Sequence, residues 1–516
     1  MNRVKGTLFY ILISVLLFSF IRVMIFLLFG EKFSDLTLSE RIRGFLDGIR
    51  FDFSSIATFV GIPILLLNLP SIRWKTWISI WSWIFYLLLV LMILIMASDV
   101  IYFSFLGRHI SNEVLFVWSD INFIIAMLIE YKIYLILYIL FCFVLAFFWN
   151  RIRNILINCK STNIVTEILN FVLLCLILFF GMRGGFSSKS INIADAFGVA
   201  KLSYANLVLN GIFSSYHSSK FVLQNFQENQ NFYNFLSEED AIETLNLKNR
   251  NRDFPAMMTI HSKGPHKNNF NLVVLLLESW TPRFIDSFGN ANFKVTPNFD
   301  RLAKEGIKFT NFYSVGRRSI QGIQAVLTGV FPAPGLPVIG YGLELSKFLG
   351  LGHIADKQGY STIMIQSSKR RSYRMNSISK ATGFSEYYGM EDMPKILEYP
   401  SRAEPKFGWD YETLIFLKNK LDEIKKPFLA FVFTGTTHAS FAYPGKKFEV
   451  RPHSTKSVDG YLNTLFYSDW SIGEFIESAK RTEWFDNTIF IFVADHPSEF
   501  VDDNDFREKF HIPCII

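Results

Sequence analysis

The stretch TIFIFVADHPSEF, residues 488–500, joins a strand-like apolar run to two metal-ligating side chains. Six apolar residues run from Ile489 to Ala494, and the run ends at Asp495 and His496. Short continuous apolar runs bounded by polar residues are typical of strands buried in a parallel sheet. Carboxylate and imidazole groups are ligands for divalent cations. The stretch therefore predicts a strand whose carboxyl end supplies two ligands of a metal site.

Other apolar runs have the same character, and helical patterns lie between them. They are NLVVLLL at residues 271–277, STIMIQ at 361–366 and PFLAFVF at 427–433. The stretch TPNFDRLAKEG predicts a helix with Thr296 as N-cap, Pro297 as first helical residue and Gly306 at its end. Strands that alternate with helices predict an α/β domain with a mostly parallel sheet and helices on both faces. Its site should lie at the carboxyl ends of the strands.

Two further candidate ligands follow predicted strands. Glu278 comes directly after residues 271–277, and His438 follows residues 427–433 through the sequence TGTT. Taken singly, Glu278 would be a solvated loop residue or helix cap, and His438 a hydrogen-bonding loop residue. Together with Asp495 and His496, at equivalent strand ends, they favour a metal site with open positions for substrate.

A candidate nucleophile, Ser319, lies in SVGRRSIQGIQAVLTG, residues 314–329. A helix-compatible run follows it, and the start of a helix favours anions such as a phosphoryl or sulfuryl group. A nearby metal would lower the pKa of the serine hydroxyl and activate it for attack. The alternative interpretation is that Ser319 only caps the helix.

The first part of the chain predicts a multi-pass helical membrane domain. Half of all residues are hydrophobic and 55 are Phe, and the long apolar runs lie before about residue 182. Five segments approach the ~20 residues that a membrane-spanning helix needs. They are Leu8–Phe29, Phe53–Leu69, Trp77–Ser98, Ile124–Phe148 and Val165–Met182. Basic residues in the short loops predict a cytoplasmic amino terminus and place everything after Met182 outside the cytoplasm.

Ionisable residues near the predicted outer face allow two interpretations. They are Arg22, Arg50, Asp52 and Asp99. They either pair or snorkel for structural reasons, or line a polar notch that holds a lipid headgroup. The net charge of +7 is modest and the sequence lacks a basic arm, so no nucleic-acid partner is expected.

These features predict three parts. Residues 1–182 form a transmembrane domain with five helices, residues 183–269 form a surface-hugging connector, and residues 270–516 form the catalytic domain. Of the four cysteines only Cys514 lies in the catalytic domain, and none has CxxC spacing, so neither a disulfide within that domain nor a thiolate zinc site is expected. The chain stops on an apolar strand, and truncation of the last domain is one interpretation of this early end.

Four motifs, in order, resemble the alkaline phosphatase/sulfatase superfamily. They are ESW (278–280), TPNFDRLAKEG (296–306), GRRSIQGIQAVLTGVFP (316–332) and VADH (493–496). With five predicted spans, the chain resembles the lipoteichoic acid synthase branch, the membrane-bound phosphoglycerol transferases. The resemblance implies that Glu278, Ser319, Asp495 and His496 bind a divalent metal, Mn²⁺ first, with Zn²⁺ or Mg²⁺ as alternatives. It makes Ser319 the nucleophile, where the family has Thr, and His438 a substrate contact.

The resemblance also implies a reaction. Ser319 would attack the phosphodiester of a phospholipid such as phosphatidylglycerol and release diacylglycerol. The headgroup would then pass from Ser319 to a hydroxyl of a glycolipid or glycan acceptor. The protein would lie in the cell's inner (cytoplasmic) membrane, with its catalytic domain outside the cytoplasm.

The chain departs from the family pattern around the substrate. Tyr373 and Met375 stand where the synthases have Trp and Arg contacting the phosphoglycerol, and Ser368 stands at an Asp. Arg374 is the neighbouring candidate for the anion contact. The identity of the headgroup is therefore open. His511 precedes the final apolar run much as a histidine does in relatives, which makes it a weaker candidate ligand.

Four other functions are alternatives to this one. A formylglycine sulfatase needs a C/S-x-P-x-R motif, which is absent at Ser319. A phosphoethanolamine transferase would use the same nucleophile, but such relatives rely on disulfides that a single cysteine cannot form. An inactive scaffold is disfavoured because all four core residues are present. The sequence does not separate a transferase from a phosphodiester hydrolase.

Overall fold

The protein divides into two compact units. The computed structural model describes residues 3–229 and 270–516, with gaps at 73, 118–120, 160–162, 188–189, 200, 290–291, 333–337, 347, 401–404, 502–504 and 506. The first unit comprises residues 1–220, 337–349 and 373–383, and the second comprises residues 221–336, 350–372 and 384–516. Residues 230–269, the rest of the predicted connector, lie outside the described part of the chain.

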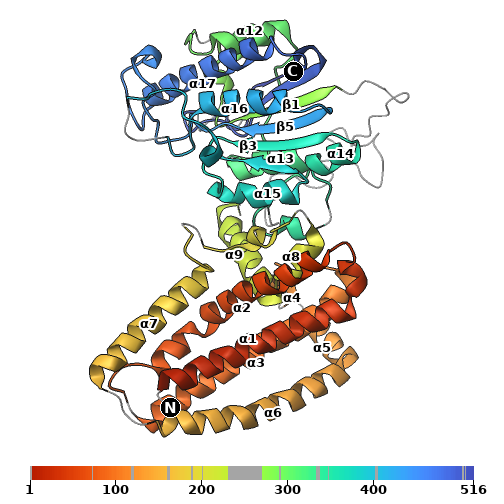
Figure 1. Ribbon diagram of the computed structural model, residues 1–516, viewed down its shortest axis with the longest axis vertical. Helices are drawn as coiled ribbons and strands as arrows, with labels where there is room; N and C mark the ends of the chain where they lie inside the picture. Colours follow the sequence, from red (N-terminus) through yellow and green to blue (C-terminus); the bar gives the residue numbers. More distant parts are fainter. Residues whose placement is uncertain are drawn as a thin grey trace. The chain divides into compact units, whose positions relative to one another are not determined.

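The first unit is built on long apolar helices (Figure 1). Within the described residues, five helices are long and apolar enough to cross a membrane, which confirms the predicted multi-pass helical region. They are α1 (Arg3–Leu28), α2 (Leu38–Leu67), α3 (Lys75–Leu106), α6 (Lys132–Ile157) and α7 (Ile164–Arg183). Each helix is longer than its predicted span, and the fourth predicted span, Ile124–Phe148, is divided between α5 and α6. Short helices α4 (Val114–Val117) and α5 (Ile121–Glu130) lie between α3 and α6.

Helix α2 is the centre of this bundle, and it packs against α1, α3 and α7. Gly181 of α7 allows close contact with α2, because a Cβ there would lie 2.3 Å from the Phe53 ring. On the other side, Tyr10 of α1 stacks on Trp149 of α6 with ring centroids 3.8 Å apart. The Tyr10 hydroxyl also lies 2.8 Å from the Ser82 hydroxyl of α3. Aromatic packing and small residues therefore hold the helices together.

The connector differs from the predicted surface linker, because its described part enters the core of the first unit. It contains α8 (Leu202–Val208) and α9 (Gly211–Asn229), and Tyr204, Leu207 and Phe213 are buried. The buried Arg22 pairs with Asp52 and donates to the carbonyl oxygens of Leu207 (2.8 Å) and Val208 (2.7 Å). A charged side chain buried in this way needs such partners.

The other ionisable residues near this end of the bundle are also engaged inside the first unit. Asp99 Oδ2 lies 2.6 Å from His109 Nδ1, and Asp99 Oδ1 accepts a hydrogen bond from the Ile110 N–H. Arg50 donates to the carbonyl of Gly184. These contacts favour the structural interpretation of Arg22, Arg50, Asp52 and Asp99 over the lipid-headgroup notch, which stays a hypothesis.

Two segments of the predicted catalytic domain belong to the first unit. They contain the 3₁₀ turn Leu343–Leu345 and α15 (Met375–Ala381). Arg374 Nε lies 3.3 Å from Asp195, and Lys380 Nζ donates to the Gly198 carbonyl at 2.6 Å. Leu345 is 1% exposed and lies in the hydrophobic core of this unit. The boundary at residue 270 therefore does not coincide with the division between the two units.

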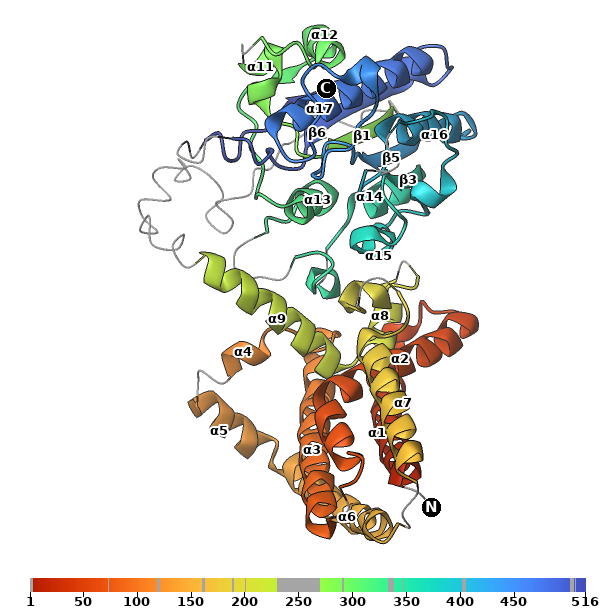
Figure 2. The ribbon, with the colours of Figure 1, turned by 90° about the vertical axis from the view of Figure 1, so that its left-hand side faces the viewer.

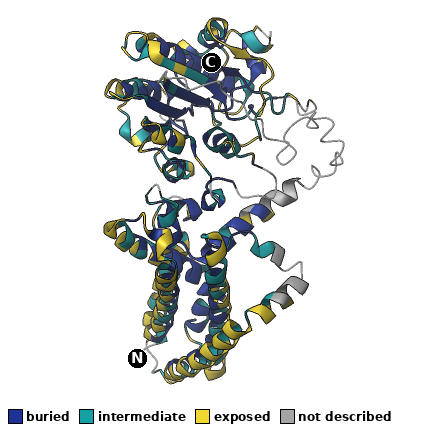
Figure 3. Ribbon diagram, turned by 90° about the vertical axis from the view of Figure 1, so that its right-hand side faces the viewer, coloured by how far each residue is buried: buried dark blue, intermediate teal, exposed yellow. Residues whose placement is uncertain are grey.

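The second unit contains a seven-stranded sheet with strand order β2-β7-β6-β1-β5-β3-β4. All described strand pairs are parallel except those that β7 makes with β2 and β6, which confirms the predicted mostly parallel sheet. The strands are β1 (Asn271–Leu277), β2 (Lys308–Phe309), β3 (Ser361–Gln366), β4 (Glu386–Tyr388), β5 (Phe428–Phe433), β6 (Thr488–Ala494) and β7 (Cys514–Ile515). The central strands β1 and β5 are almost entirely buried (Figure 3).

Helices cover both faces of this sheet, as predicted (Figure 2). Helices α16 (Asp410–Asp422) and α17 (Val458–Ala479) pack together on one face, and α13 (Ser319–Thr328) and α14 (Leu351–Lys357) lie on the other. Helix α12 (Pro297–Glu305) packs on α17, next to the short α11 (Asp286–Gly289). Helix α12 has Thr296 as N-cap, Pro297 at its first position and Gly306 as C-cap, which confirms the predicted boundaries.

Candidate metal centre and active site

The register of β1 against β6 brings the candidate ligands together. Leu277 pairs with Ala494, so the next residues, Glu278 and Asp495, leave the sheet side by side. The Ser279 N–H donates to Asp495 Oδ1 at 2.8 Å and joins the two strand ends. Parallel strands place successive residues at one edge, which is where sites of this fold class form.

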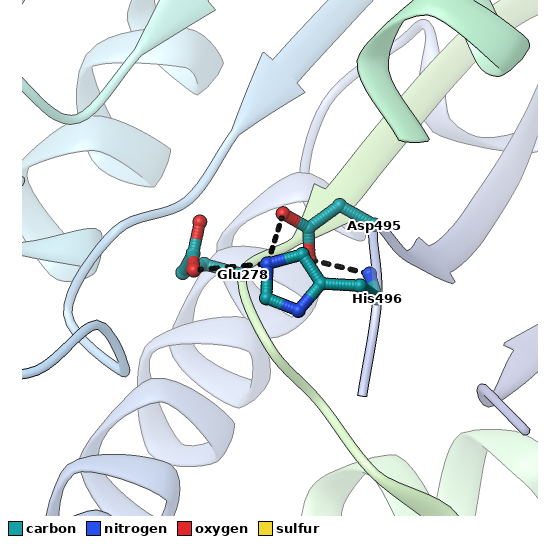
Figure 4. A group of neighbouring side chains, drawn as sticks. All are labelled: Glu278, Asp495 and His496. Atoms are coloured by element: carbon teal, nitrogen blue, oxygen red, sulfur yellow. Dashed lines mark hydrogen bonds and ion pairs between the residues drawn. The ribbon is translucent and has the colours of Figure 1, made fainter. Parts of the chain in front are cut away.

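Glu278, Asp495 and His496 form the group of ligating side chains found within the described residues (Figure 4). One ligand atom from each lies within 4.8 Å of the others. His496 Nε2 is 3.5 Å from Asp495 Oδ2 and 3.8 Å from Glu278 Oε1. Two oxygens and one imidazole nitrogen at this spacing suit a divalent cation with open positions for substrate.

Hydrogen bonds orient the histidine for this role. The Nδ1–H of His496 donates to the Pro497 carbonyl at 2.7 Å, because a carbonyl oxygen can only accept. In the neutral imidazole, Nε2 therefore carries the lone pair and faces the two carboxylates. A backbone carbonyl that fixes the tautomer in this way is a common feature of metal-ligating histidines.

Hydrogen bonds compensate the burial of the two carboxylates only in part. Glu278 and Asp495 are each 1% exposed, and Asp495 Oδ2 has no hydrogen-bond partner among the described residues. Burial, and then the negative charge of Asp495, raise the pKa of Glu278 well above its ordinary value. Buried carboxylates of this kind are paired or bind metals. The donor set therefore fits a divalent cation.

Ser319 lies beside this cluster. Its Oγ is 3.3 Å from Glu278 Oε2 and 3.1 Å from His496 Nε2. Ser319 is the first residue of α13, and Arg318 is the N-cap, so the serine hydroxyl does not cap its own helix. Gly322 permits this approach, because a Cβ there would lie 2.3 Å from the Asp495 carbonyl oxygen.

His438 follows β5 at the same edge of the sheet. Its Nδ1 contacts the Ala439 carbonyl, and its ring lies 4.0 Å from the Phe407 ring centroid to centroid. Burial lowers the pKa of His438, and the hydrogen bond to Ala439 opposes this shift. The imidazole is thus favoured in its neutral form.

The remaining candidates are held elsewhere. Tyr373 and Arg374 belong to the first unit, and Arg374 Nη2 donates to the Ser190 carbonyl at 2.9 Å. The ring of His511 lies 5.3 Å from that of Tyr313, and its Nε2 donates to the Thr310 carbonyl at 2.9 Å. The ligand cluster within the described residues does not include His511.

Several residues that hold Glu278 by hydrogen bonds were not predicted from the sequence. The Ser279 hydroxyl donates to Glu278 Oε1 at 2.8 Å, and the Tyr461 hydroxyl donates to the Ser279 carbonyl at 2.9 Å. The Glu278 N–H donates to Thr434 Oγ1 at 3.0 Å, and Thr437 Oγ1 donates to the Glu278 carbonyl. The repeated threonines of TGTT could have predicted these contacts. Their hydroxyls can form hydrogen bonds with the backbone at the end of a neighbouring strand.

Comparison with known proteins finds relatives of the second part of the chain. The family model described as Sulfatase matches residues 270–516. Phosphoglycerol transferase I from Citrobacter koseri is 25% identical over 256 residues, which cover 47% of this chain and 33% of that protein. Lipoteichoic acid synthase 1 from Bacillus subtilis is 25% identical over 262 residues, covering 46% and 39%. The matches therefore span less than half the length of these curated relatives. One relative is named as a transferase and the other as a synthase.

A solved structure of a protein in the alkaline phosphatase superfamily from Vibrio parahaemolyticus is also similar. It is 29% identical with a TM-score of 0.41, over 48% of this chain and 59% of that chain. The match to the Sulfatase family model confirms the prediction of a sulfatase-type domain.

Proposed function

We propose that this chain, which carries a Sulfatase-family domain in residues 270–516, is a metal-dependent phosphoglycerol-type transferase embedded in a membrane. It moves a phospholipid headgroup to an extracytoplasmic acceptor through a covalent intermediate on Ser319. The names of its relatives support the transferred group, and the five apolar helices support the membrane location. The basic residues of the short loops support an inner-membrane protein with its catalytic domain outside the cytoplasm.

One observation carries this proposal: the Ser319 hydroxyl lies within 3.3 Å of both Glu278 and His496, beside a buried Asp495 oxygen without a hydrogen-bond partner among the described residues. A nucleophile, an imidazole nitrogen and two carboxylates converge from three chain-distant segments. When bound, a divalent cation would lower the pKa of the hydroxyl and offset the charge of the phosphoryl oxygens. Glu278, Ser319, Asp495 and His496 would hold it, with Mn²⁺ as the first candidate.

In the proposed reaction the chain's own groups carry each bond change. Ser319 Oγ attacks the phosphorus of the phosphodiester. Its proton passes to one of the two hydrogen-bond acceptors beside it, Glu278 Oε2 or His496 Nε2. The bond between phosphorus and the glycerol oxygen of diacylglycerol breaks, and diacylglycerol leaves protonated. An acceptor hydroxyl then attacks phosphorus, loses its proton and restores the Ser319 hydroxyl. His438, neutral and at the same edge, would contact the substrate, while Tyr373 and Arg374 stay predicted headgroup contacts.

The experiment compares the wild-type chain with its Ser319→Ala variant. Each is in membranes supplied with Mn²⁺ and headgroup-labelled phosphatidylglycerol. Wild type should release diacylglycerol, and Ser319→Ala should reduce the release by about 10³-fold or more, since the nucleophile is lost. Ser478→Ala is the matched control, because its hydroxyl donates only to the Phe475 carbonyl of α17 at 2.8 Å. Removal of cations by a chelator should abolish the release.

The outcomes separate the related activities. Diacylglycerol release that survives Ser319→Ala would contradict the assignment of the nucleophile. Turnover of labelled phosphatidylethanolamine alone would change the headgroup, and label found only as free glycerol phosphate would make the enzyme a hydrolase.

A further inference from the structure

Asp410, outside the ligand cluster, is a buried carboxylate that gathers several chain segments. It is the first residue of α16 and is fully buried, with 0% exposure. Its carboxylate accepts hydrogen bonds from the N–H groups of Gly435 (2.8 Å) and Thr436 (3.2 Å) and from the hydroxyls of Ser367 (3.2 Å) and Ser468 (2.7 Å). In return, the Asp410 N–H donates to Thr436 Oγ1 at 2.9 Å. Hydrogen bonds to a charged acceptor are stronger than those between neutral groups.

The segment that Asp410 holds, residues 434–437, is the one that contacts the site. Thr434 and Thr437 bond to the N–H and the carbonyl of Glu278, respectively. His438 follows directly, and its N–H donates to the Gly435 carbonyl at 3.1 Å. The position of this segment therefore sets both the Glu278 backbone and the start of the His438 side chain.

Two glycines show that this arrangement is closely packed. A Cβ on Gly435 would lie 2.2 Å from the Phe407 carbonyl oxygen. Gly408 has φ +82°, and a Cβ there would lie 1.8 Å from the Ser367 carbonyl oxygen. The Phe407 ring in turn lies against the His438 ring, with centroids 4.0 Å apart and an interplanar angle of 45°. The segment before α16 thus lies directly against residues 434–438, with no space for a larger residue at these two positions.

We infer that Asp410 is a positioning residue for the transfer reaction, which holds residues 434–437 so that His438 and Glu278 keep their places. The inference rests on the proposed function. Asp410 touches none of the ligand groups and acts through the backbone of the loop. Its removal would leave two buried N–H groups and the Ser468 hydroxyl without their acceptor, while the Ser367 hydroxyl would keep only the Phe433 carbonyl at 3.4 Å. The loop would then move to find other partners.

A double-mutant cycle between Asp410→Ala and His438→Ala tests this in the full-length protein. The substrates are labelled phosphatidylglycerol and the chromogenic diester bis(4-nitrophenyl) phosphate, both with Mn²⁺. Asp410→Ala should lower kcat on the order of 10²-fold, as expected for a displaced catalytic group. The double variant should lose less than the product of the two single losses, because part of the Asp410 effect acts through His438. Asp410→Asn, which keeps an acceptor oxygen, should restore most of the rate.

Asp469 supplies the matched control. It too is a buried aspartate, on α17, and accepts the N–H groups of Asn298 (3.0 Å) and Phe299 (2.7 Å) at the start of α12. The losses in Asp469→Ala and His438→Ala should multiply. Amide hydrogen exchange should quicken at residues 434–438 in Asp410→Ala and at residues 298–300 in Asp469→Ala.

Multiplying losses for Asp410 and His438, or unchanged exchange at residues 434–438, would overturn the inference. Failure of the wild type to turn over either diester would instead refute the proposed function. Because exchange does not depend on turnover, it would still show whether Asp410 holds the loop.

Discussion

Glu278 is a buried carboxylate whose proposed role is to bind a cation. Burial and the neighbouring charge of Asp495 raise its pKa, while the hydroxyls of Ser279 and Ser319 oppose that shift. A metal ligand must be deprotonated, so a cation and a proton compete for this carboxylate. The affinity for the cation should therefore depend on pH.

Mn²⁺ binding should release protons at any pH below the raised pKa of Glu278. The affinity should therefore rise with pH until Glu278 is ionised in the metal-free protein, and level off above that point. Calorimetric titrations in buffers with different ionisation enthalpies measure the number of protons released.

Glu278→Gln should weaken Mn²⁺ binding by about 10-fold or more and remove most of this proton release. Glu344→Gln is the control. Burial raises the pKa of Glu344 to about 7, but its carboxylate accepts from Gly340 and Gly342 in the first unit and lies outside the ligand cluster. The same proton release from Glu278→Gln as from wild type would refute the assignment of Glu278.

Helix α13 places the proposed nucleophile, Ser319, beside the candidate ligands. Its first residue is Ser319, and its fourth, Gly322, lies against the backbone of Asp495. The helix can approach the end of β6 only because that position lacks a side chain. Sequence periodicity predicts the helix but not this contact.

Gly322→Ala should push α13 away from Asp495 and lower activity by roughly 10²-fold, as expected for a displacement of the nucleophile. Overpacking costs about 1–3 kcal/mol, which the better helix propensity of Ala offsets by up to ~1 kcal/mol. The transfer rate and the thermal unfolding temperature measure the two effects.

Gly61→Ala in α2 is the matched helical control, because a Cβ there would meet nothing within 4 Å. It should leave both the rate and the unfolding temperature near their wild-type values. Full activity in Gly322→Ala would show that α13 does not depend on this close approach.

At the scale of the whole molecule, the division into two units does not follow the sequence boundary at residue 270. Residues 337–349 and 373–383 lie inside the Sulfatase-family region in sequence, yet pack in the first unit. Leu345 and Ile378 are each 1% exposed there. An excised 270–516 fragment would lack the helices and connector residues of that unit.

The excised fragment should therefore aggregate more readily than the full chain, because newly exposed apolar side chains favour association. Leu345→Ser combined with Ile378→Ser should make the fragment more soluble, whereas the same pair should destabilise the full-length protein. Size-exclusion chromatography with light scattering measures the first effect, and thermal unfolding in detergent the second. A wild-type fragment that is as monomeric as the double variant would contradict this expectation.

Much of the architecture was predictable because it depends on local patterns. Apolar runs marked β1, β3, β5 and β6, and the start and end of α12 followed from Thr296, Pro297 and Gly306. The five long helices followed from length and apolar composition. The meeting of Glu278, Asp495 and His496 followed from one topological rule about strand ends. Each of these inferences needs only neighbouring residues or a general property of parallel sheets.

By itself, then, the sequence determined the types of the elements and the candidate ligands at the carboxyl ends of β1 and β6. Only the tertiary structure decided that Leu277 pairs with Ala494, that Asp495 Oδ2 has no described partner, and that Asp410 holds the loop before His438. It also decided that Arg374 joins Asp195 in the first unit and that the connector is buried. The reason is physical: strand register, burial and hydrogen-bond partners arise from contacts between residues far apart in the chain, which local patterns do not encode.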